Sequence, residues 1–222
     1  MVNIIVVTRA ALLIARRAST WTVDEHLGGQ SPECVAVDPS DPTRIYCGTA
    51  GAGLLRSLDS GRTWEPVGMG IEHGTVTAIA VSHAERAEGF GVLYAGTEPS
   101  AVFRSDTGGD GWVDLAGLRA LPSSDTWSFP PRPHTHHVRW IEADASVADR
   151  VFVAIEAGAL VRTFDRGLTW RDRVRELRPV NKPFYNQQDI KEFRSIREYI
   201  QNTFVSEEHE RLLLYHFKII LS

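Results

Sequence analysis

Short runs of apolar residues, four to seven positions long, alternate with turn residues over most of the chain. These runs are typical of β-strands because they are rich in Val, Ile, Thr and aromatic residues and are bounded by Gly, Pro, Asp and Ser. They fall into three groups of four, with strands expected at 34–38, 44–49, 54–57 and 64–67, then at 76–81, 91–97, 101–105 and 112–115, and then at 138–141, 150–155, 159–163 and 170–173. Four short strands joined by tight turns and repeated in this way predict the blades of a β-propeller.

One turn pattern recurs between the third and fourth strand of each predicted blade. It has the form S/T-x-D-x-G-x-T-W at 57–64 and 163–170, and a degenerate copy at 105–112 has Thr107 at the Asp position and Gly111 at the Thr position. An Asp side chain can accept hydrogen bonds from the backbone of its own turn, and Gly adopts backbone angles that other residues resist. We therefore predict that this turn fastens the blade, through Ser57, Asp59, Gly61, Thr63, Trp64, Ser105, Gly109, Trp112, Thr163, Asp165, Gly167, Thr169 and Trp170.

These turns resemble the Asp-box, or BNR, repeat of sialidase-like β-propellers. The segments D-P-S-D-P at 38–42 and I-Y-C-G-T at 45–49 are similar to those of bacterial WD40/YVTN/BNR-like repeat proteins. The resemblance covers about residues 4–174 and implies a propeller with the boxes on the blade rim, away from the central pocket. The superfamily includes sialidases, other glycoside hydrolases, sortilin-type receptors and a photosystem II assembly factor. The arginine cluster, acid/base Asp and Tyr–Glu pair of sialidases are not assigned to any residue here, so the resemblance implies a fold and no activity.

The N-terminal apolar segment fits the same repeat. Residues 4–8 align with the second strand of a blade and 11–14 with the third, which predicts that the chain begins inside a blade. The alignment also predicts a fourth box that has lost its Asp and Gly, with Arg16 and Ala18 in their places. A signal peptide is disfavoured because Arg9 interrupts the segment and no basic residue precedes it. The segment is also shorter than the about 20 apolar residues that span a bilayer. We therefore expect a soluble, cytoplasmic protein without a membrane partner.

The blade pattern ends near residue 174. Two prolines and many polar residues at 175–188 predict a linker, and apolar residues spaced by three and four at 189–222 predict a helical tail. The expected fold is therefore all-β over 1–174, a partial β-propeller of about three and a half four-stranded blades, with a C-terminal helical tail. Propellers close with about 4–8 blades. We therefore predict a truncated ring, or a half that associates with itself through open blade edges.

Composition excludes several classes of function. A net charge of −4 and a pI near 6.1 do not indicate the basic surface that binds nucleic acid. The two cysteines, Cys34 and Cys47, are too few for a disulfide framework. They are expected to be free buried thiols, with a single bridge as the alternative.

The loops that join the second and third strands of a blade, and those that join one blade to the next, are predicted to share one face. The long loop before the third full blade contains Arg132, His134, His136 and His137 and leads into a strand with Arg139. These five residues are the candidate ligand-binding residues. Imidazoles also bind metals, but the H-x-H-H spacing matches no common zinc motif, so we predict neither a metal nor a cofactor.

Two carboxylates occupy equivalent loops of that face, Glu98 and Glu156. A carboxylate pair can act as acid and base in glycoside hydrolysis, so these residues are the catalytic candidates of an alternative hypothesis. The preferred hypothesis is a non-enzymatic scaffold or binding module for a protein or glycan ligand. The alternative is a sialidase-like glycoside hydrolase fragment that acts on glycans.

Overall fold

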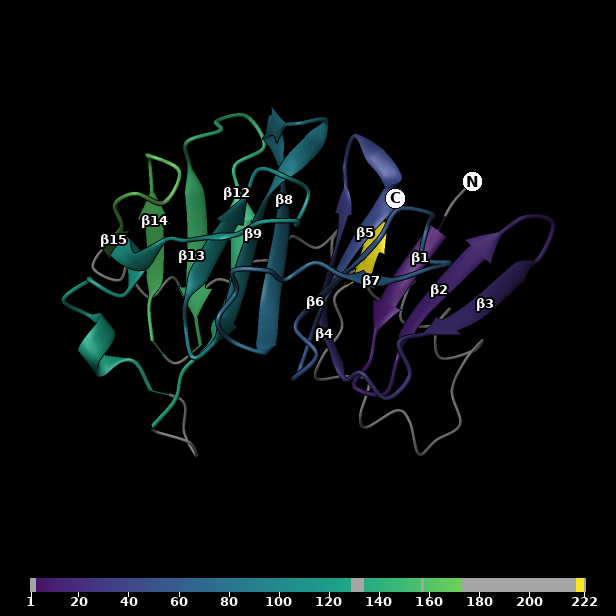
Figure 1. Ribbon diagram of the computed structural model, residues 1–222, viewed down its shortest axis with the longest axis horizontal. Coiled ribbons are helices and arrows are strands. Elements are labelled where there is room, and N and C mark those ends of the chain that lie inside the picture. The colour runs from purple at the N-terminus through teal and green to yellow at the C-terminus, as the bar shows by residue number, and fades with distance from the viewer. Residues whose placement is uncertain (1–2, 129–133, 157, 173–218, 222) are drawn as a thin grey trace, which may run out of the picture. The chain divides into compact units, whose positions relative to one another are not determined.

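The computed structural model describes residues 3–128, 134–156, 158–172 and 219–221 (Figure 1). These residues form four antiparallel sheets of four strands each, with two short 3-10 helices, η1 (Ala116–Leu118) and η2 (Ser124–Thr126). The prediction of an all-β, propeller-like fold built from four-stranded blades is confirmed.

Three of the sheets take their strands in chain order. The second sheet contains β4 (Pro32–Asp38), β5 (Asp41–Thr49), β6 (Leu54–Ser57) and β7 (Glu65–Pro66). The third contains β8 (Thr75–Ala87), β9 (Phe90–Glu98), β10 (Val102–Ser105) and β11 (Val113–Asp114). The fourth contains β12 (Val138–Ala143), β13 (Val151–Ile155), β14 (Leu160–Thr163) and β15 (Arg171–Asp172).

The first sheet joins the two ends of the chain. It has the order β16-β1-β2-β3, with β1 (Asn3–Val7), β2 (Leu12–Arg17) and β3 (Trp21–His26) from the N-terminal end and β16 (Ile219–Leu221) from the C-terminal end. β16 pairs antiparallel with β1 and lies beside it in Figure 1. The helical tail predicted over 189–222 is therefore wrong for Ile219–Leu221, which form a strand because β1 offers them an open edge. The rest of that tail and the linker 175–188 lie outside the described residues.

The predicted fourth box is also wrong. β2 and β3 pair in register as far as Arg17 and Trp21, so only residues 18–20 remain for the turn. Arg16, which the alignment placed at the Asp position, lies inside β2 and forms an ion pair with Asp24 of β3. A short hairpin therefore stands where the other three sheets have an eight-residue turn.

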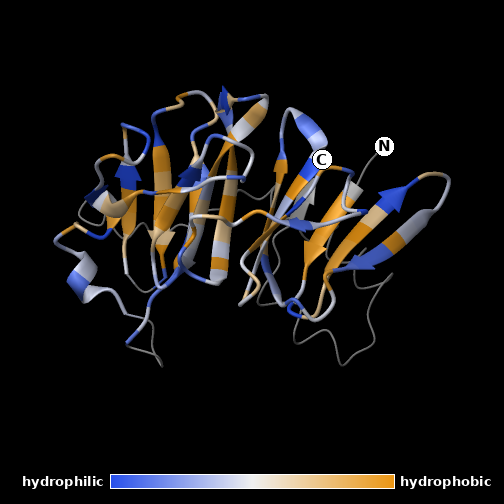
Figure 2. Cartoon of the chain, in the orientation of Figure 1, coloured by the Kyte–Doolittle hydropathy of each residue, from blue (hydrophilic) through white to orange (hydrophobic). Residues whose placement is uncertain are grey.

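Consecutive sheets pack face to face through three apolar cores. In β9, Val92 and Tyr94 belong to the core shared with the fourth sheet, whereas Leu93 and Ala95 belong to the core shared with the second. Successive side chains of a strand point to opposite faces, so a strand covered on both sides reads as a continuous apolar run. Figure 2 shows this concentration of hydrophobic residues in the strands, with polar residues at the turns.

The two cysteines lie on opposite faces of the second sheet. Cys34 belongs to the core shared with the third sheet and Cys47 to the core shared with the first. Both are buried thiols outside any disulfide, as the preferred prediction had it, and the single bridge does not form. Burial raises the pKa of the Cys47 thiol well above its usual range, which keeps the thiol protonated.

The eight-residue turn at 57–64 is closed by two side chains. Ser57 Oγ accepts a hydrogen bond from the Gly61 amide at 2.8 Å and donates to Asp59 Oδ1 at 2.8 Å. Asp59 Oδ1 also accepts the amides of Arg62 and Thr63, both at 2.9 Å, and its Oδ2 accepts the Thr63 hydroxyl at 2.7 Å. Gly61 has a φ of 86°, which an L side chain rarely adopts. The carboxylate thus accepts hydrogen bonds from backbone amides of the turn that do not pair with a strand.

The other two copies show which bonds the carboxylate supplies. In the fourth sheet Asp165 accepts the amide and the hydroxyl of Thr169, at 2.8 and 2.5 Å. In the degenerate copy the hydroxyl of Thr107 accepts the Gly111 amide at 2.9 Å. A single hydroxyl therefore replaces one of the carboxylate's bonds. The Trp112 indole donates to Gly109 O at 2.9 Å and to Val67 O of the preceding segment at 2.7 Å, which ties the turn to its neighbour.

We predict that Asp59→Ala lowers the unfolding temperature, because the amides of residues 62 and 63 lose their acceptor. Thermal unfolding followed by circular dichroism measures this, and a decrease of a few degrees is expected. Asp125→Ala is the control, since Asp125 is exposed on η2 away from these turns. Equal unfolding temperatures for Asp59→Ala and wild type would contradict the fastening role.

The same carboxylate should make stability depend on pH. Hydrogen bonds from the Thr63 amide and hydroxyl lower the pKa of Asp59 to about 2, whereas an unfolded Asp titrates near about 3.9. A lowered folded-state pKa stabilises the protein above the unfolded pKa, and that contribution is lost as the pH falls from about 4 toward 2. The unfolding temperatures of wild type and Asp59→Asn should therefore differ most at pH 6 and converge near pH 2. A difference that stays constant over this range would show that ionisation of Asp59 does not matter.

Candidate functional site

The ends of the strands form two distinct sets of loops. The eight-residue turns contact the beginning of the second strand of their own sheet or the turn before it, through Ser60 N to Thr43 O of β5 at 2.8 Å and Arg166 N to Asp149 O at 3.1 Å. At the opposite end, the Glu156 amide donates to His137 O at 3.1 Å, which joins the β13–β14 loop to the segment before β12. The candidate ligand-binding and catalytic residues belong to this opposite end.

The histidine segment is partly described. Arg132 lies outside the described residues. His134 is exposed, His136 is half-buried and His137 is buried, while Arg139 is exposed at the start of β12. The structure therefore spreads the predicted ligand-binding residues over environments that range from buried to exposed.

Glu156 connects two of these residues. Its Oε2 lies 2.5 Å from His137 Nε2 and 3.8 Å from Arg139 Nε. Two cationic or potentially cationic groups therefore surround one carboxylate oxygen. The contacts hold the Glu156 side chain against the segment that leads into β12.

Glu98 approaches the same segment from the third sheet. Its Oε1 accepts the hydroxyl of Thr135 at 3.2 Å, and the Glu98–Pro99 peptide bond is cis. Glu98 and Glu156 thus each bond to a residue of the stretch 135–137, one from the end of β9 and one from the β13–β14 loop. We call Glu98, Thr135, His136, His137, Arg139 and Glu156 the loop cluster.

Trp127 gives the cluster an apolar side. Its ring meets the His136 imidazole edge-on, with centroids 5.5 Å apart and an interplanar angle of 83°. Burial lowers the pKa of His136, the charge of His137 lowers it further, and Glu98 opposes the change. The sequence analysis proposed neither Trp127 nor Thr135 as a site residue. Both residues lie close to the histidines in the sequence, and this closeness could have identified them as candidates.

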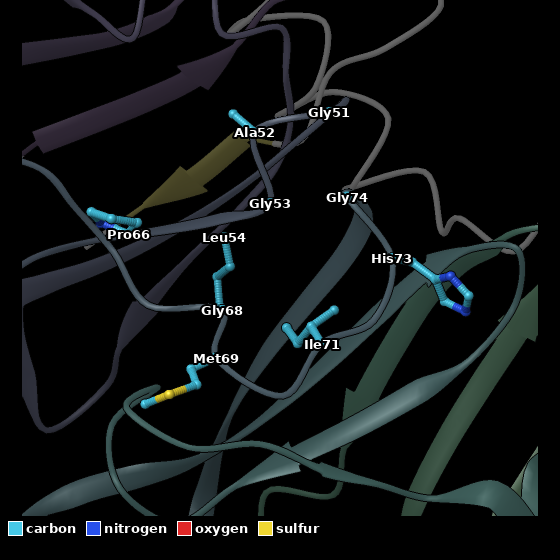
Figure 3. Close-up of a pocket in the computed structure, with 10 residues that line it drawn as sticks. All are labelled: Gly51, Ala52, Gly53, Leu54, Pro66, Gly68, Met69, Ile71, His73 and Gly74. Carbon is cyan, nitrogen blue, oxygen red and sulfur yellow. The ribbon is translucent and has the colours of Figure 1, made fainter.

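A shallow pocket of about 490 Å³ lies at the same end of the second and third sheets. Figure 3 shows its lining, which comes from two facing stretches of chain: Gly51, Ala52, Gly53, Leu54, Pro66, Gly68, Met69, Ile71, His73 and Gly74. The amides of Gly51 and Gly53 both donate to Gly74 O, at 3.0 and 2.9 Å, and hold the two stretches together. None of the ten lining residues has a carboxylate. Sequence reasoning missed this pocket because its lining combines four glycines with mostly apolar side chains, which form no recognisable motif.

Within the described residues, no group of three or more His, Cys, Asp or Glu side chains could hold a metal ion. No helix among them has the length and apolar character needed to cross a membrane.

Comparisons with known proteins support the fold. No protein-family model matches the chain. A probable oligoxyloglucan-reducing end-specific xyloglucanase from Neosartorya fischeri is 29% identical over 119 residues, which is 49% of this chain and 14% of that protein. A nidogen/laminin complex matches 78% of this chain and 61% of the other, with 14% identity and a TM-score of 0.54. The GH74 xyloglucanase from Xanthomonas campestris matches 80% of this chain and 30% of the other, with 20% identity and a TM-score of 0.53.

These likenesses, with the four observed sheets, place the described chain among the β-propeller proteins. The chain spans 14% of the length of the curated relative that it matches and less than two thirds of either structural neighbour. At these identities the likeness extends to the fold and not to an activity.

We predict that Trp127→Ala raises the pKa of His136 toward its ordinary value of 6.5, because the indole contributes to the burial that lowers it. Titration of the imidazole carbon resonances by NMR measures the change. His26 is the internal control: burial lowers its pKa too, but it lies at the end of β3. A His136 titration unaffected by the substitution would show that Trp127 does not bury the imidazole.

Proposed function

We propose that the chain is a non-enzymatic β-propeller binding module of the Asp-box, or BNR-repeat, kind. Its ligand is a segment of another protein, and the ligand meets the propeller end that has the loop cluster and the pocket. The three eight-residue turns support the repeat assignment through their shared hydrogen bonds. They lie at the other end of the sheets and serve the fold.

The engagement of both candidate carboxylates is the observation that carries this proposal. Glu156 is held by His137 and Arg139, and Glu98 accepts from Thr135. A glycosidase needs two carboxyl groups about 5–10 Å apart on either side of an open sugar site, one of them able to deliver a proton. The pocket at the same end of the second and third sheets is instead lined by glycine backbone, Leu54, Met69, Ile71 and His73. Backbone and apolar lining with a few polar groups nearby suits recognition of a peptide.

The comparisons are consistent with protein binding. One structural neighbour is described as a nidogen/laminin complex, so a related fold occurs in a complex between proteins. Met69 adds an exposed, adaptable apolar side chain at the pocket rim, with 76% of its surface accessible.

A glycoside hydrolase fragment is the alternative, and the similarity to xyloglucanases is the observation that favours it. In that case Glu98 and Glu156 would have to leave their present partners when a glycan binds. Xyloglucan oligosaccharides are the substrates that distinguish the two functions.

The test of the proposed function uses an array of 15-residue peptides probed with the purified chain. We expect discrete peptides to bind, and we expect Arg139→Glu to reduce their binding about tenfold or more, since it places a second carboxylate beside Glu156. Arg44→Glu is the matched control, an arginine substitution at the opposite end of the sheets. The same proteins are incubated with xyloglucan oligosaccharides, and no release of reducing ends is expected.

Two outcomes would overturn the proposed function. Peptide binding that Arg139→Glu and Arg44→Glu reduce equally would place the binding elsewhere. Release of reducing ends that is lost in Glu156→Gln and in Glu98→Gln would establish the hydrolase instead.

A further inference from the structure

Contacts of consecutive side chains anchor the segment just before β12. Thr135 donates to Glu98 Oε1 at the end of β9 at 3.2 Å, and the Nε2 atom of His137 lies 2.5 Å from Glu156 Oε2. Neither Thr135 nor His137 belongs to a strand. The position of the segment therefore depends on these contacts and on those of His136, which lies between the two anchors.

The His136 ring packs on a buried tryptophan. Trp127 is 5% exposed, and its ring meets the imidazole edge-on with centroids 5.5 Å apart. Trp127 in turn lies on the β13–β14 loop, because a Cβ atom added at Gly158 would be only 3.1 Å from its Cγ atom. The tryptophan thus connects His136 to the loop that has Glu156.

One nitrogen of this imidazole is in a poor environment for charge. The Nδ1 atom of His136 is buried and, within the described residues, has no hydrogen-bond partner. A neutral imidazole has one N–H group, whereas a protonated imidazole has an N–H group on both nitrogens. In the protonated ring Nδ1 would therefore be a charged donor without an acceptor, which is costly in a buried position.

The surrounding charges do not offset this cost. The ionisable groups on the segments that meet at His136 are Glu98 of β9, Asp125 of η2, His134 and His137 of its own segment, Arg139 of β12 and Glu156 of the β13–β14 loop. Burial lowers the pKa of His136 from its ordinary value of 6.5, the charge of His137 lowers it further, and Glu98 opposes the change. The packed ring therefore binds a proton less readily than an imidazole in water.

The ring can also reach water. His136 is half-buried and lies in a segment without strand pairing, so rotation of its side chain can carry the imidazole from Trp127 into solvent. A solvated ring titrates near about 6.5. Because protons bind the solvated position more tightly than the packed one, protonation shifts the balance toward solvent. The packed position is favoured at neutral pH and loses that advantage as the pH falls below 6.5.

We propose that His136 is a pH-sensitive switch of the loop cluster. At neutral pH the uncharged ring packs on Trp127 and holds the segment 135–137 in the observed position. In acid the protonated ring leaves Trp127, and Glu98 exchanges the Thr135 hydroxyl for the imidazolium, which makes a charge-assisted bond. The switch weakens peptide binding at this end of the propeller in acid, a consequence that rests on the proposed function.

The test follows the full chain by NMR between about pH 8 and about pH 5.5, a range that spans the titration of histidine. We expect a nuclear Overhauser contact between the Trp127 indole and the His136 ring at the higher pH and its loss at the lower pH. The Thr135 amide should shift with the same midpoint, below 6.5. His136→Phe should keep both signals at their high-pH positions. His134→Gln, at an exposed histidine two residues away, is the matched control and should leave the transition unchanged.

Three results would overturn the switch. A Trp127 contact that persists at the lower pH would show that His136 is protonated in place. A midpoint above 6.5 would show that attraction between the imidazolium and the indole outweighs burial. An unchanged Thr135 transition in His136→Phe would assign it to another group. Circular dichroism at both pH values checks the fold, and His136→Gln replaces His136→Phe if that variant does not fold.

A second measurement connects the switch to binding. Peptides that bind the wild type at the higher pH should bind about tenfold more weakly at the lower pH. His136→Phe should bind them equally at both values. Equal binding by the wild type at both values would overturn control of binding by His136. The NMR measurement needs no ligand, so a chain that binds no peptide would contradict the proposed function alone.

Discussion

Coverage of apolar sheet faces is the constraint on which the rest of the structure depends. A short four-stranded sheet with apolar residues on both faces is stable only when another sheet covers each face. The third sheet meets this condition on both sides, so Tyr94 and Leu93, adjacent in the sequence, are both fully buried in different cores. On the faces of the first and fourth sheets that no described sheet covers, Ile4, Val6, Leu13 and Phe152 are only partly buried.

The two ends of the sheets differ in what their side chains do. At one end, turns of eight residues leave backbone amides that no strand reaches, and Asp59 or Asp165 accepts them. At the other end, the loops vary in length, so Glu98 can bond to Thr135 and Glu156 to His137 without disturbing the sheets. Variable loops on a rigid scaffold are where binding usually resides.

Much of the candidate site could not be read from the chain. The equivalence of Glu98 and Glu156 followed from the repeat, because both stand after the second strand of a blade. Their partners did not follow, since the contact of Glu156 with His137 depends on how the β13–β14 loop folds back on the segment before β12. The pocket was invisible for a related reason: glycine backbone lines much of it, and glycine leaves no chemical signature.

The sequence by itself determined the strands and the repeated turns of three blades, because alternation of side chains and turn chemistry are local properties. Only the tertiary structure decided that residues 219–221 form a strand on β1, that the first hairpin has no box and that Cys34 and Cys47 face opposite cores. Each of these depends on which segment lies beside another. Pairing between the two ends of a chain is set by open edges and uncovered faces, and neither can be recognised in a single run of residues.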